Sequence, residues 1–472
     1  MSGPGWMSTQ ELREAVAAGE IDTVLVVFTD MQGRLQGKRV HSAFFVDEVL
    51  EGVTEGCNYL LAVDVEMNTV DGYAMSSWAR GYGDFVFRPD LATLRRAAWL
   101  PATAMVQCDL EWMDGSPVLA SPRQILAAQV GRAAGLGFQV LAGTELEFMV
   151  FADSYESAWD AGYRGLEPAN RYNVDYSILG TGRVEPLLRA IRNAMYGSGL
   201  VVESAKGECN LGQHEIAFKY ADALRTADNH VVYKTAAKEL AASAGQSITF
   251  MAKFNEREGS SCHVHMSLRG LDGRIVFDSA GTSADHDRSD HDRPGHASTG
   301  AAAPTPVFEH FVAGVLATMR EFTLLYAPNI NSYKRFQPGT FAPTVVAWGR
   351  DNRTCAVRVV GHGPGLRLEN RLPGADVNPY LTLAAMIAGG LHGIEAELPL
   401  EPEFVGNAYT SDKPRVPSTL REAAELFEHS QLARSAFGEE MVEHYLNNAR
   451  VELAAFEAAV TDWERVRGFE RL

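Results

Sequence analysis

The octapeptide TELEFMVF, at residues 144–151, carries the strongest structural signal in this 472-residue chain. Its polar and apolar residues alternate, which predicts a β-strand because successive side chains of a strand point to opposite faces. Glu145 and Glu147 then share one face. Two carboxylates so close together on a plain solvent-facing strand would repel each other without benefit, so the pair indicates a site with a chemical role.

Three further segments repeat this spacing of two or place acids across a turn. CHVHMSL (262–268) puts His263, His265 and Ser267 on one face. LRLENRL (366–372) does the same for Arg367, Glu369 and Arg371, and ECNLGQHE (208–215) offers Glu208 and Glu215. For any single strand, a polar face in water is the more common explanation. Together the segments favour one shared site, whose glutamates and histidine, without cysteine, suit Mg²⁺ or Mn²⁺ better than zinc.

Six arginines lie between residues 335 and 371, in a protein whose formal net charge is −18. Carboxylate or phosphate binding by the planar guanidinium group is the best local reason for such a cluster. Metal-binding acids beside anion-binding arginines are typical of a phosphoryl-transfer site. The chain has no Walker loop and no dinucleotide fingerprint, so any ATP must be held in another way.

The strongly negative charge argues against nucleic acid or an anionic membrane as the main partner. The five cysteines are scattered and odd in number, which is typical of reduced thiols. The sequence shows no signal peptide and no apolar run of membrane-spanning length. These observations predict a cytoplasmic protein.

The first ~110 residues read as a small α+β unit, with a short helix at 8–20 and a hairpin of strands at 23–29 and 39–43. Two more strands are expected at 82–90 and 103–110, and the proline-rich SPVLASPRQ (116–124) marks a boundary before a long helix. A strand is expected at 247–254. Helical spacing or composition predicts helices at 184–196, 222–244, 307–326, 379–395 and most of 416–470. Residues 281–306 have few large apolar side chains, which favours a mobile, solvated loop over a metal-binding one despite three histidines.

Several long motifs, in a fixed order, resemble the glutamine synthetase family of the bacterial type I kind. They are GTELEF (143–148), GECNLGQHEIAFKY (207–220), HVHMSL (263–268), NSYKRFQPGTFAPT (331–344), GRDNRTCAVRV (349–359) and LRLENRLPGADVNPYL (366–381). The resemblance implies an α+β fold, with an N-terminal β-grasp domain (1–112) and a C-terminal catalytic domain (113–472) built on an antiparallel active-site sheet. It also implies a homo-oligomer of two stacked hexameric rings with sites between subunits.

The resemblance assigns roles to individual residues. Glu145, His263 and Glu369 match the ligands of one metal, and Glu147, Glu208 and Glu215 those of another, so two or more Mg²⁺ or Mn²⁺ ions are expected in each site. Glu147 would lie near the substrate carboxyl. Gly259, Arg335 and Arg371 match glutamate-binding positions. Arg353 and Arg358 match phosphate-binding arginines, and His265 and Ser267 would face the nucleotide. The implied reaction uses ATP to form γ-glutamyl phosphate from L-glutamate, after which a nitrogen nucleophile displaces phosphate.

The departures from the family pattern concern the ammonium site. Phe341 stands where ammonia-using members carry a glutamate, and Glu258 stands where an asparagine is expected. The ammonium-site aspartate could be Asp64 or Asp71, and a lysine expected before Glu369 is absent near Pro364.

These departures predict a pocket for a larger primary amine, as in the γ-glutamyl-amine ligases of the family, with ethanolamine favoured and a polyamine such as putrescine next. An ammonium-using glutamine synthetase, in which Phe341 only packs the flap, and a catalytically silent nitrogen-metabolite sensor are the alternatives.

Overall fold

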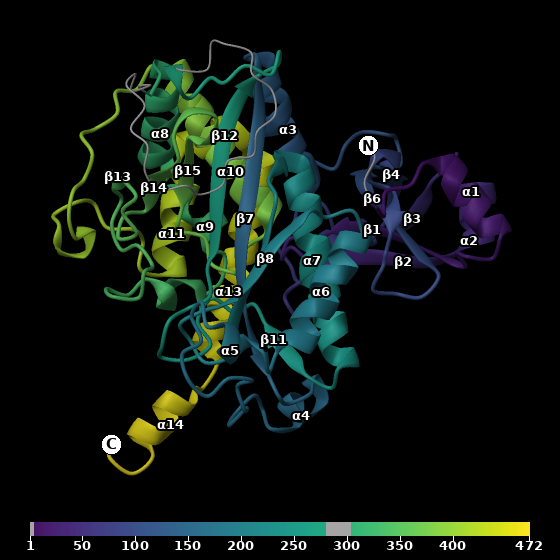
Figure 1. Cartoon of the computed structure of the whole chain (residues 1–472), viewed down its shortest axis with the longest axis horizontal. Coiled ribbons are helices and arrows are strands. Elements are labelled where there is room, and N and C mark those ends of the chain that lie inside the picture. Colours follow the sequence, from purple (N-terminus) through teal and green to yellow (C-terminus); the bar gives the residue numbers. More distant parts are fainter. Residues whose placement is uncertain (1–3, 280–303) are drawn as a thin grey trace.

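The computed structural model describes residues 4–279 and 304–472, and most of the loop expected at 281–306 lies outside the described residues. Figure 1 shows two sheets, with the N-terminal elements forming a lobe beside the larger body that holds the rest of the chain. The strands of the first sheet lie within residues 23–111, and those of the second within residues 138–370.

The first sheet has six strands in the order β2-β1-β6-β4-β3, with β5 paired to β6. Strands β1 and β6 are parallel and the other pairs are antiparallel. The expected helix 8–20 is α1, whose first turn is closed by a capping box between Ser8 and Glu11. The bounds are α1 Thr9–Ala17, β1 Thr23–Thr29, β2 Leu35–His41, α2 Ser42–Phe44, β3 Thr54–Cys57, β4 Asp84–Pro89, β5 Arg95–Arg96 and β6 Thr103–Glu111.

The second sheet has nine strands, with the main order β13-β14-β15-β12-β7-β9-β8 and with β10 and β11 paired to β7. All of its pairs are antiparallel except β13 with β14, which is parallel. The bounds are β7 Phe138–Phe151, β8 Val202–Gly207, β9 Gln213–Phe218, β10 Ala221–Asp222, β11 Ser247–Thr249, β12 Cys262–Gly270, β13 Trp348–Arg350, β14 Val357–Val360 and β15 Arg367–Asn370.

One face of this sheet is packed against helices. Leu146, Phe148 and Val150 of β7 are buried, and the Phe148 ring meets the Tyr233 ring of α7 edge-on at 6.4 Å. Helices α3 and α7 contact β7, and α10 packs on α3 and α8. The longer helices are α3 Pro122–Gly135, α6 Glu185–Gly197, α7 Ala223–Ser243, α8 Pro306–Thr318, α10 Pro379–Glu395, α11 Leu420–Glu428 and α13 Glu439–Ala458. The shorter ones are α4 Tyr155–Asp160, α5 Ile178–Thr181, α9 Thr323–Tyr326, α12 Gln431–Phe437 and α14 Asp462–Gly468.

The two sheets are joined by buried polar contacts. Asn378, the residue before α10, donates to the carbonyls of Asp30 and Met31 at 3.1 and 3.0 Å. Arg123 of α3 is almost fully buried and pairs with Asp228 of α7 and with Asp90 and Asp109 of the first sheet's region. Loss of this arginine would leave three carboxylates, of which Asp228 is buried, without their shared cation, so Arg123 fixes the geometry between the sheets.

Three expected elements differ from the prediction. The second strand of the hairpin begins at Leu35 rather than Arg39, because β1 and β2 pair without interruption from Thr29↔Leu35 onward. The strand expected at 247–254 covers only Ser247–Thr249. The helix expected at 307–326 divides into α8 and α9, at a point where the hydroxyls of Thr318 and Thr323 bond to carbonyls of the preceding turn.

None of the helices in residues 4–279 and 304–472 is both long enough and apolar enough to cross a lipid bilayer.

Candidate active site

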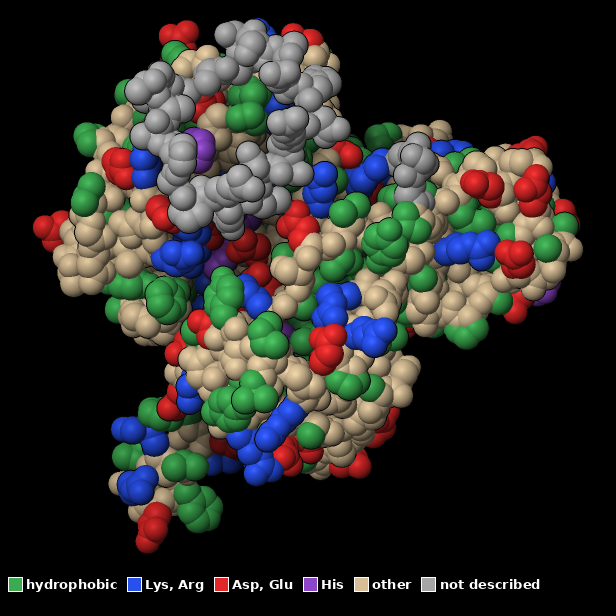
Figure 2. All heavy atoms as spheres, viewed as in Figure 1, with side chains coloured by type: hydrophobic (Ala, Val, Ile, Leu, Met, Phe, Trp, Pro, Cys, Tyr) green, Lys and Arg blue, Asp and Glu red, His purple; other side chains and the backbone are tan. Residues whose placement is uncertain are grey.

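The register of the second sheet places the predicted site residues in rows across its open face. Directly opposed residues of neighbouring strands point to the same side. One row runs from Arg358 on β14 to Glu369 on β15 and His265 on β12. The other rows are His263 opposite Glu145, and the series Glu147, Glu215 and Lys206 across β7, β9 and β8. Figure 2 shows a hollow near the centre of this view, with acidic and histidine side chains on its floor and Lys or Arg side chains beside it.

The first cluster joins Glu145, Glu369 and both histidines. Ligand atoms of Glu145, His265 and Glu369 all lie within 4.8 Å of one another. His263 Nδ1 lies 3.3 Å from Glu145 and 3.6 Å from Glu369, and its Nε2 is buried without a partner in the described structure. Both histidines therefore face this cluster, although the sequence assigned only His263 to the metal. The donor set of two carboxylates and imidazole nitrogen fits a divalent cation.

Burial lowers the pKa of His263 to about 4, with the nearby Arg371 acting in the same direction. Its imidazole is therefore neutral near pH 7, which is the form that can bind a metal. Burial alone would raise the pKa of Glu145, but hydrogen bonds from His263 and His265 outweigh it and hold that pKa below its ordinary value. The Glu145 carboxylate is thus ionised near pH 7.

The second cluster holds Glu147, Glu208 and Glu215, whose ligand oxygens also lie within 4.8 Å of one another. Glu147 Oε2 accepts from Gln213 Nε2 at 2.8 Å and from the Ser261 amide at 2.7 Å, which fixes its orientation. A set of three carboxylate ligands, without sulfur, is the kind that Mg²⁺ or Mn²⁺ prefers. The residues present fit a hard divalent cation.

The arginines predicted to bind glutamate border both clusters, Arg335 through Ser261 beside Glu147 and Arg371 through Glu369. Arg335 is buried, donates to Ser261 Oγ at 3.2 Å and to the carbonyls of Arg371 and Leu372, and keeps its Nε without a partner. A Cβ at Gly259 would lie 2.6 Å from Arg335 Cγ, so only glycine allows this approach. Arg371 pairs with Glu369 and also has an unpartnered buried Nε. The two guanidinium groups therefore retain donors for an anion.

The residues predicted to contact phosphate and nucleotide differ in whether they bond to other site residues. Arg358 pairs with Glu369 at 3.0 Å and with Asp351. Arg353 is exposed between β13 and β14, and no hydrogen bond or ion pair is recorded for it in the described structure. Ser267 follows His263 and His265 on the same face of β12.

The two residues that depart from the family pattern lie at the edges of this arrangement. Phe341 is 55% exposed, has a φ of +58°, and its carbonyl accepts from Arg371 Nη2 at 3.4 Å. Glu258 precedes Gly259, its carbonyl accepts from Asn210 at 2.5 Å, and its Oε2 is buried without a hydrogen bond in the described structure. The Phe341 ring is thus open to solvent, whereas Glu258 Oε2 lies 3.7 Å from Arg257 Nε in an ion pair.

Asp64 lies outside the site within one chain. Its carboxylate accepts from the backbone and side-chain amides of Asn68, at 2.8 and 3.0 Å. The pKa of Glu452 on α13 is raised, chiefly by the burial of Glu452 and next by the negative charge of Asp64. Among the described residues, no hydrogen bond or ion pair joins Asp64 to either cluster.

Sequence reasoning missed Lys206, Gln213 and Asp351, which contact predicted site residues. Lys206 forms ion pairs with Glu208 and, at 3.9 Å, with Glu215. The spacing of two that revealed the other strands also relates Lys206 to Glu208, and it could have revealed the lysine.

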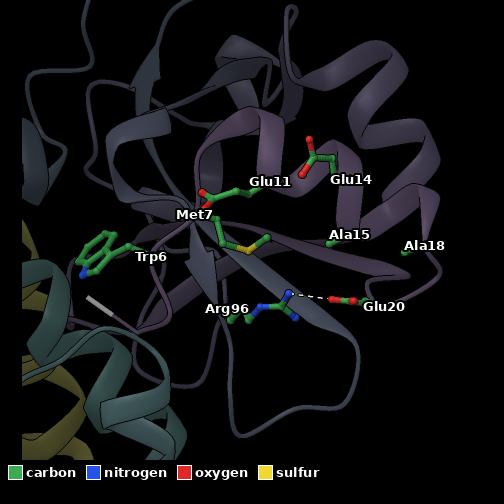
Figure 3. A pocket seen from close by; sticks show the side chains of 8 residues that line it. All are labelled: Trp6, Met7, Glu11, Glu14, Ala15, Ala18, Glu20 and Arg96. Carbon is green, nitrogen blue, oxygen red and sulfur yellow. Dashed lines mark hydrogen bonds and ion pairs between the residues drawn. The ribbon is translucent and has the colours of Figure 1, made fainter. Parts of the chain in front are cut away.

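A separate cavity of about 350 Å³ lies at the N-terminal lobe (Figure 3), and none of its lining residues belongs to these rows. Its acids include Glu20, which pairs with Arg96 at 3.0 Å and is therefore already satisfied. The cavity is lined by Trp6, Met7, Glu11, Glu14, Ala15, Ala18, Glu20 and Arg96. It gathers no cluster of metal-binding side chains like those of the second sheet.

We expect metal binding at the second cluster to release about one proton at pH 7. Burial, followed by the charge of Glu145, raises the pKa of Glu215 to about 8, and burial with Glu208 and Glu215 raises that of Glu147. The protonated form thus competes with the metal below pH 8, and the apparent affinity should rise with pH up to that value. Calorimetric titration in two buffers of different ionisation enthalpy measures the release. Equal apparent enthalpies in both buffers would contradict it.

Comparison with known proteins identifies the family of this chain. The family description "Glutamine synthetase, catalytic domain" matches residues 119–467. The chain is 65% identical over 466 residues to the gamma-glutamylethanolamide synthetase of Streptomyces coelicolor, which covers 99% of this chain and 96% of that protein. It is 37% identical over 462 residues to a glutamate–isopropylamine ligase of Pseudomonas, which covers 97% of each.

Two other matches show how widely the fold is shared. A glutamine synthetase of Thermus thermophilus is 34% identical over 400 residues, covering 81% of this chain and 82% of that protein. The solved structure of a GmaS–ADP complex superposes with a TM-score of 0.81 at 26% identity, covering 97% of this chain and 99% of that one. With the family description matched over most of its length, this chain belongs to the glutamine synthetase family.

Proposed function

We propose that the protein is an ATP-dependent ligase that joins the γ-carboxyl of L-glutamate to a small primary amine through γ-glutamyl phosphate. Ethanolamine is the favoured amine, and a polyamine such as putrescine is the next. The observation that carries the proposal is the presence of two carboxylate clusters on one face of one sheet, with the buried Arg335 and Arg371 beside them. The names of the two amine-ligase relatives support the choice of acceptor.

In this proposal the buried arginines bind glutamate. Arg335, beside Gly259, and Arg371, each with a buried Nε–H group that has no hydrogen bond, would bind the substrate carboxylates. Arg358 and Arg353 hold the phosphoryl oxygens, and His265 with Ser267 faces the nucleotide. Two divalent cations, held by Glu145, His263 and Glu369 and by Glu147, Glu208 and Glu215, would neutralise charge that develops on the phosphates and on the γ-carboxyl.

The same proposal assigns the amine end to Phe341 and Glu258. The exposed Phe341 ring offers apolar contact to a carbon chain. Glu258, whose Oε2 has no hydrogen bond but lies 3.7 Å from Arg257 Nε, would exchange this ion pair for the cationic nitrogen or accept its proton. An ammonium ion has no carbon chain for the ring to contact, so this pocket favours the larger amine.

We also propose that residues 1–112 form a β-grasp domain, that residues 113–472 form the catalytic domain, and that subunits assemble as two stacked hexameric rings. Because Asp64 contacts Asn68 and not its own chain's clusters, a second copy of this chain would supply Asp64 to the amine site. The cytoplasmic location stays a prediction.

A panel of amines tests the function directly. Phosphate release is measured with ATP, glutamate and, in separate reactions, ethanolamine, putrescine, isopropylamine or ammonium. We expect that turnover with at least one of the amines exceeds turnover with ammonium. Strong turnover with ammonium alone would identify a glutamine synthetase. ADP formation with none of them, despite tight nucleotide and glutamate binding, would identify a sensor.

A further inference from the structure

Lys206 occupies a position that the sheet register dictates. It lies on β8 directly opposite Glu215 of β9, and it precedes Glu208 by two residues, so all three side chains point to the same face. Its ammonium forms an ion pair with Glu208 and lies 3.9 Å from Glu215 Oε1. Both glutamates are members of the second cluster.

A third group completes the surroundings of this ammonium. The Tyr176 ring lies 5.0 Å from Lys206 Nζ, within the range of a cation–π contact. Tyr176 holds a left-handed backbone, with a φ of +53°, and its amide donates to the carbonyl of Gly207 at 3.4 Å. The lysine is therefore held between two carboxylates and an aromatic face, and 23% of its side chain is exposed.

The charges around the second cluster indicate what the ion pairs of Lys206 do. Glu147 is oriented by neutral donors, Gln213 and the Ser261 amide. Lys206 is the one cation with which Glu208 and Glu215 form ion pairs in the described part of the chain. Glu215 is 7% exposed, so water screens the pair less than it would a surface ion pair.

We propose that Lys206 is an internal counter-ion of the second metal cluster, which stabilises Glu208 and Glu215 while no metal is bound and is displaced from them when a divalent cation binds. Lys206 thereby sets the metal affinity of this cluster. The inference rests on the proposed function only in that the second cluster binds a divalent cation. Lys206 is a positioning residue, since it acts through the metal ligands.

Removing the charge should strengthen metal binding for two reasons. Without Lys206 the metal-free protein holds the three crowded carboxyl groups of Glu147, Glu208 and Glu215 with no nearby ammonium, and the metal-bound protein loses a repulsive positive charge. We expect Lys206→Met to tighten Mn²⁺ binding at one of the two sites about tenfold. Lys206→Arg, which keeps the charge, should leave binding at the wild-type level or weaken it.

Mn²⁺ titration followed by electron paramagnetic resonance measures the free ion and needs no turnover. Lys413→Met is the matched control, because Lys413 forms a 2.6 Å pair with Glu401, which lies outside both clusters, and its loss changes the net charge equally. The thermal midpoint of Lys206→Met should fall without metal and recover at saturating Mn²⁺. If Lys206 only joined β8 to β9, the midpoint would fall equally under both conditions.

Three outcomes decide the inference. Tighter Mn²⁺ binding in Lys206→Met but not in Lys413→Met supports it. Unchanged or weaker binding in Lys206→Met, with two ions bound by the wild-type protein, overturns it and leaves the proposed function standing. Absence of a second Mn²⁺ in the wild-type protein overturns both the inference and the proposed metal site. Should Lys206→Met fail to fold, Lys206→Gln, which keeps polarity without charge, takes its place and is expected to tighten binding in the same way.

Discussion

Replacement of Glu145 by glutamine is expected to lower glutamate-dependent phosphate release about 10³-fold while changing the free energy of unfolding by less than about 1 kcal/mol. Glu145 contacts both His263 and His265, and its side chain is 37% exposed. Glutamine preserves the shape but removes the charge that a divalent cation requires. Steady-state phosphate release and thermal unfolding measure the two effects.

The control for this prediction is Glu395→Gln, whose carboxylate pairs with Arg132 at 40% exposure and belongs to neither cluster. It should retain wild-type turnover. Glu369 is a poorer choice than Glu145, because Glu369 is buried and pairs with Arg358 and Arg371, so its loss would also destabilise the fold. Near-normal turnover in Glu145→Gln would exclude Glu145 from the catalytic machinery.

Replacement of Phe341 by glutamate is expected to shift the ratio of ammonium activity to ethanolamine activity about 100-fold toward ammonium. The Phe341 ring is exposed, and the Phe341 carbonyl accepts a hydrogen bond at 3.4 Å from Arg371, one of the two arginines proposed to bind glutamate. A carboxylate there could take a proton from ammonium, and it would remove the apolar contact for a carbon chain. The kcat/KM values for both nucleophiles give the ratio.

Phe341→Gln separates the two effects, because glutamine matches glutamate in size but is not a base. It should lose ethanolamine activity without gaining ammonium activity. If Phe341→Glu leaves the ratio unchanged, Phe341 only packs the segment around it and another group selects the nucleophile.

Much of the site was readable from the sequence because a strand has a period of two. The alternation in 144–151, 262–268 and 366–372 identified which side chains share a face, and the structure places them on one sheet. The alternation alone could not say which strands are neighbours, since pairing depends on contacts between segments more than a hundred residues apart. The order β15-β12-β7-β9-β8 came from the structure, although the family resemblance had already implied an antiparallel sheet.

Other features were missed in the sequence, each for a local reason. The spacing of His263 and His265 places both side chains on one face, but it does not say which of them contacts Glu145. The structure shows that both do. Lys206 was overlooked because a single lysine in a strand is usually solvated. The position of Asp64, beside Asn68 and away from the clusters of its own chain, depends on how the N-terminal lobe meets the second sheet. Such packing leaves no periodic pattern in the sequence.

The direct pairing of His263 with Glu145 and of Glu147 with Glu215 also limits how this family can change in length. A single-residue deletion inside β7 would turn its following side chains to the opposite side and send a glutamate into the helix-packed interior. Insertions and deletions in descendants of this gene should therefore be confined to connecting segments, while the central strands diverge by substitution alone.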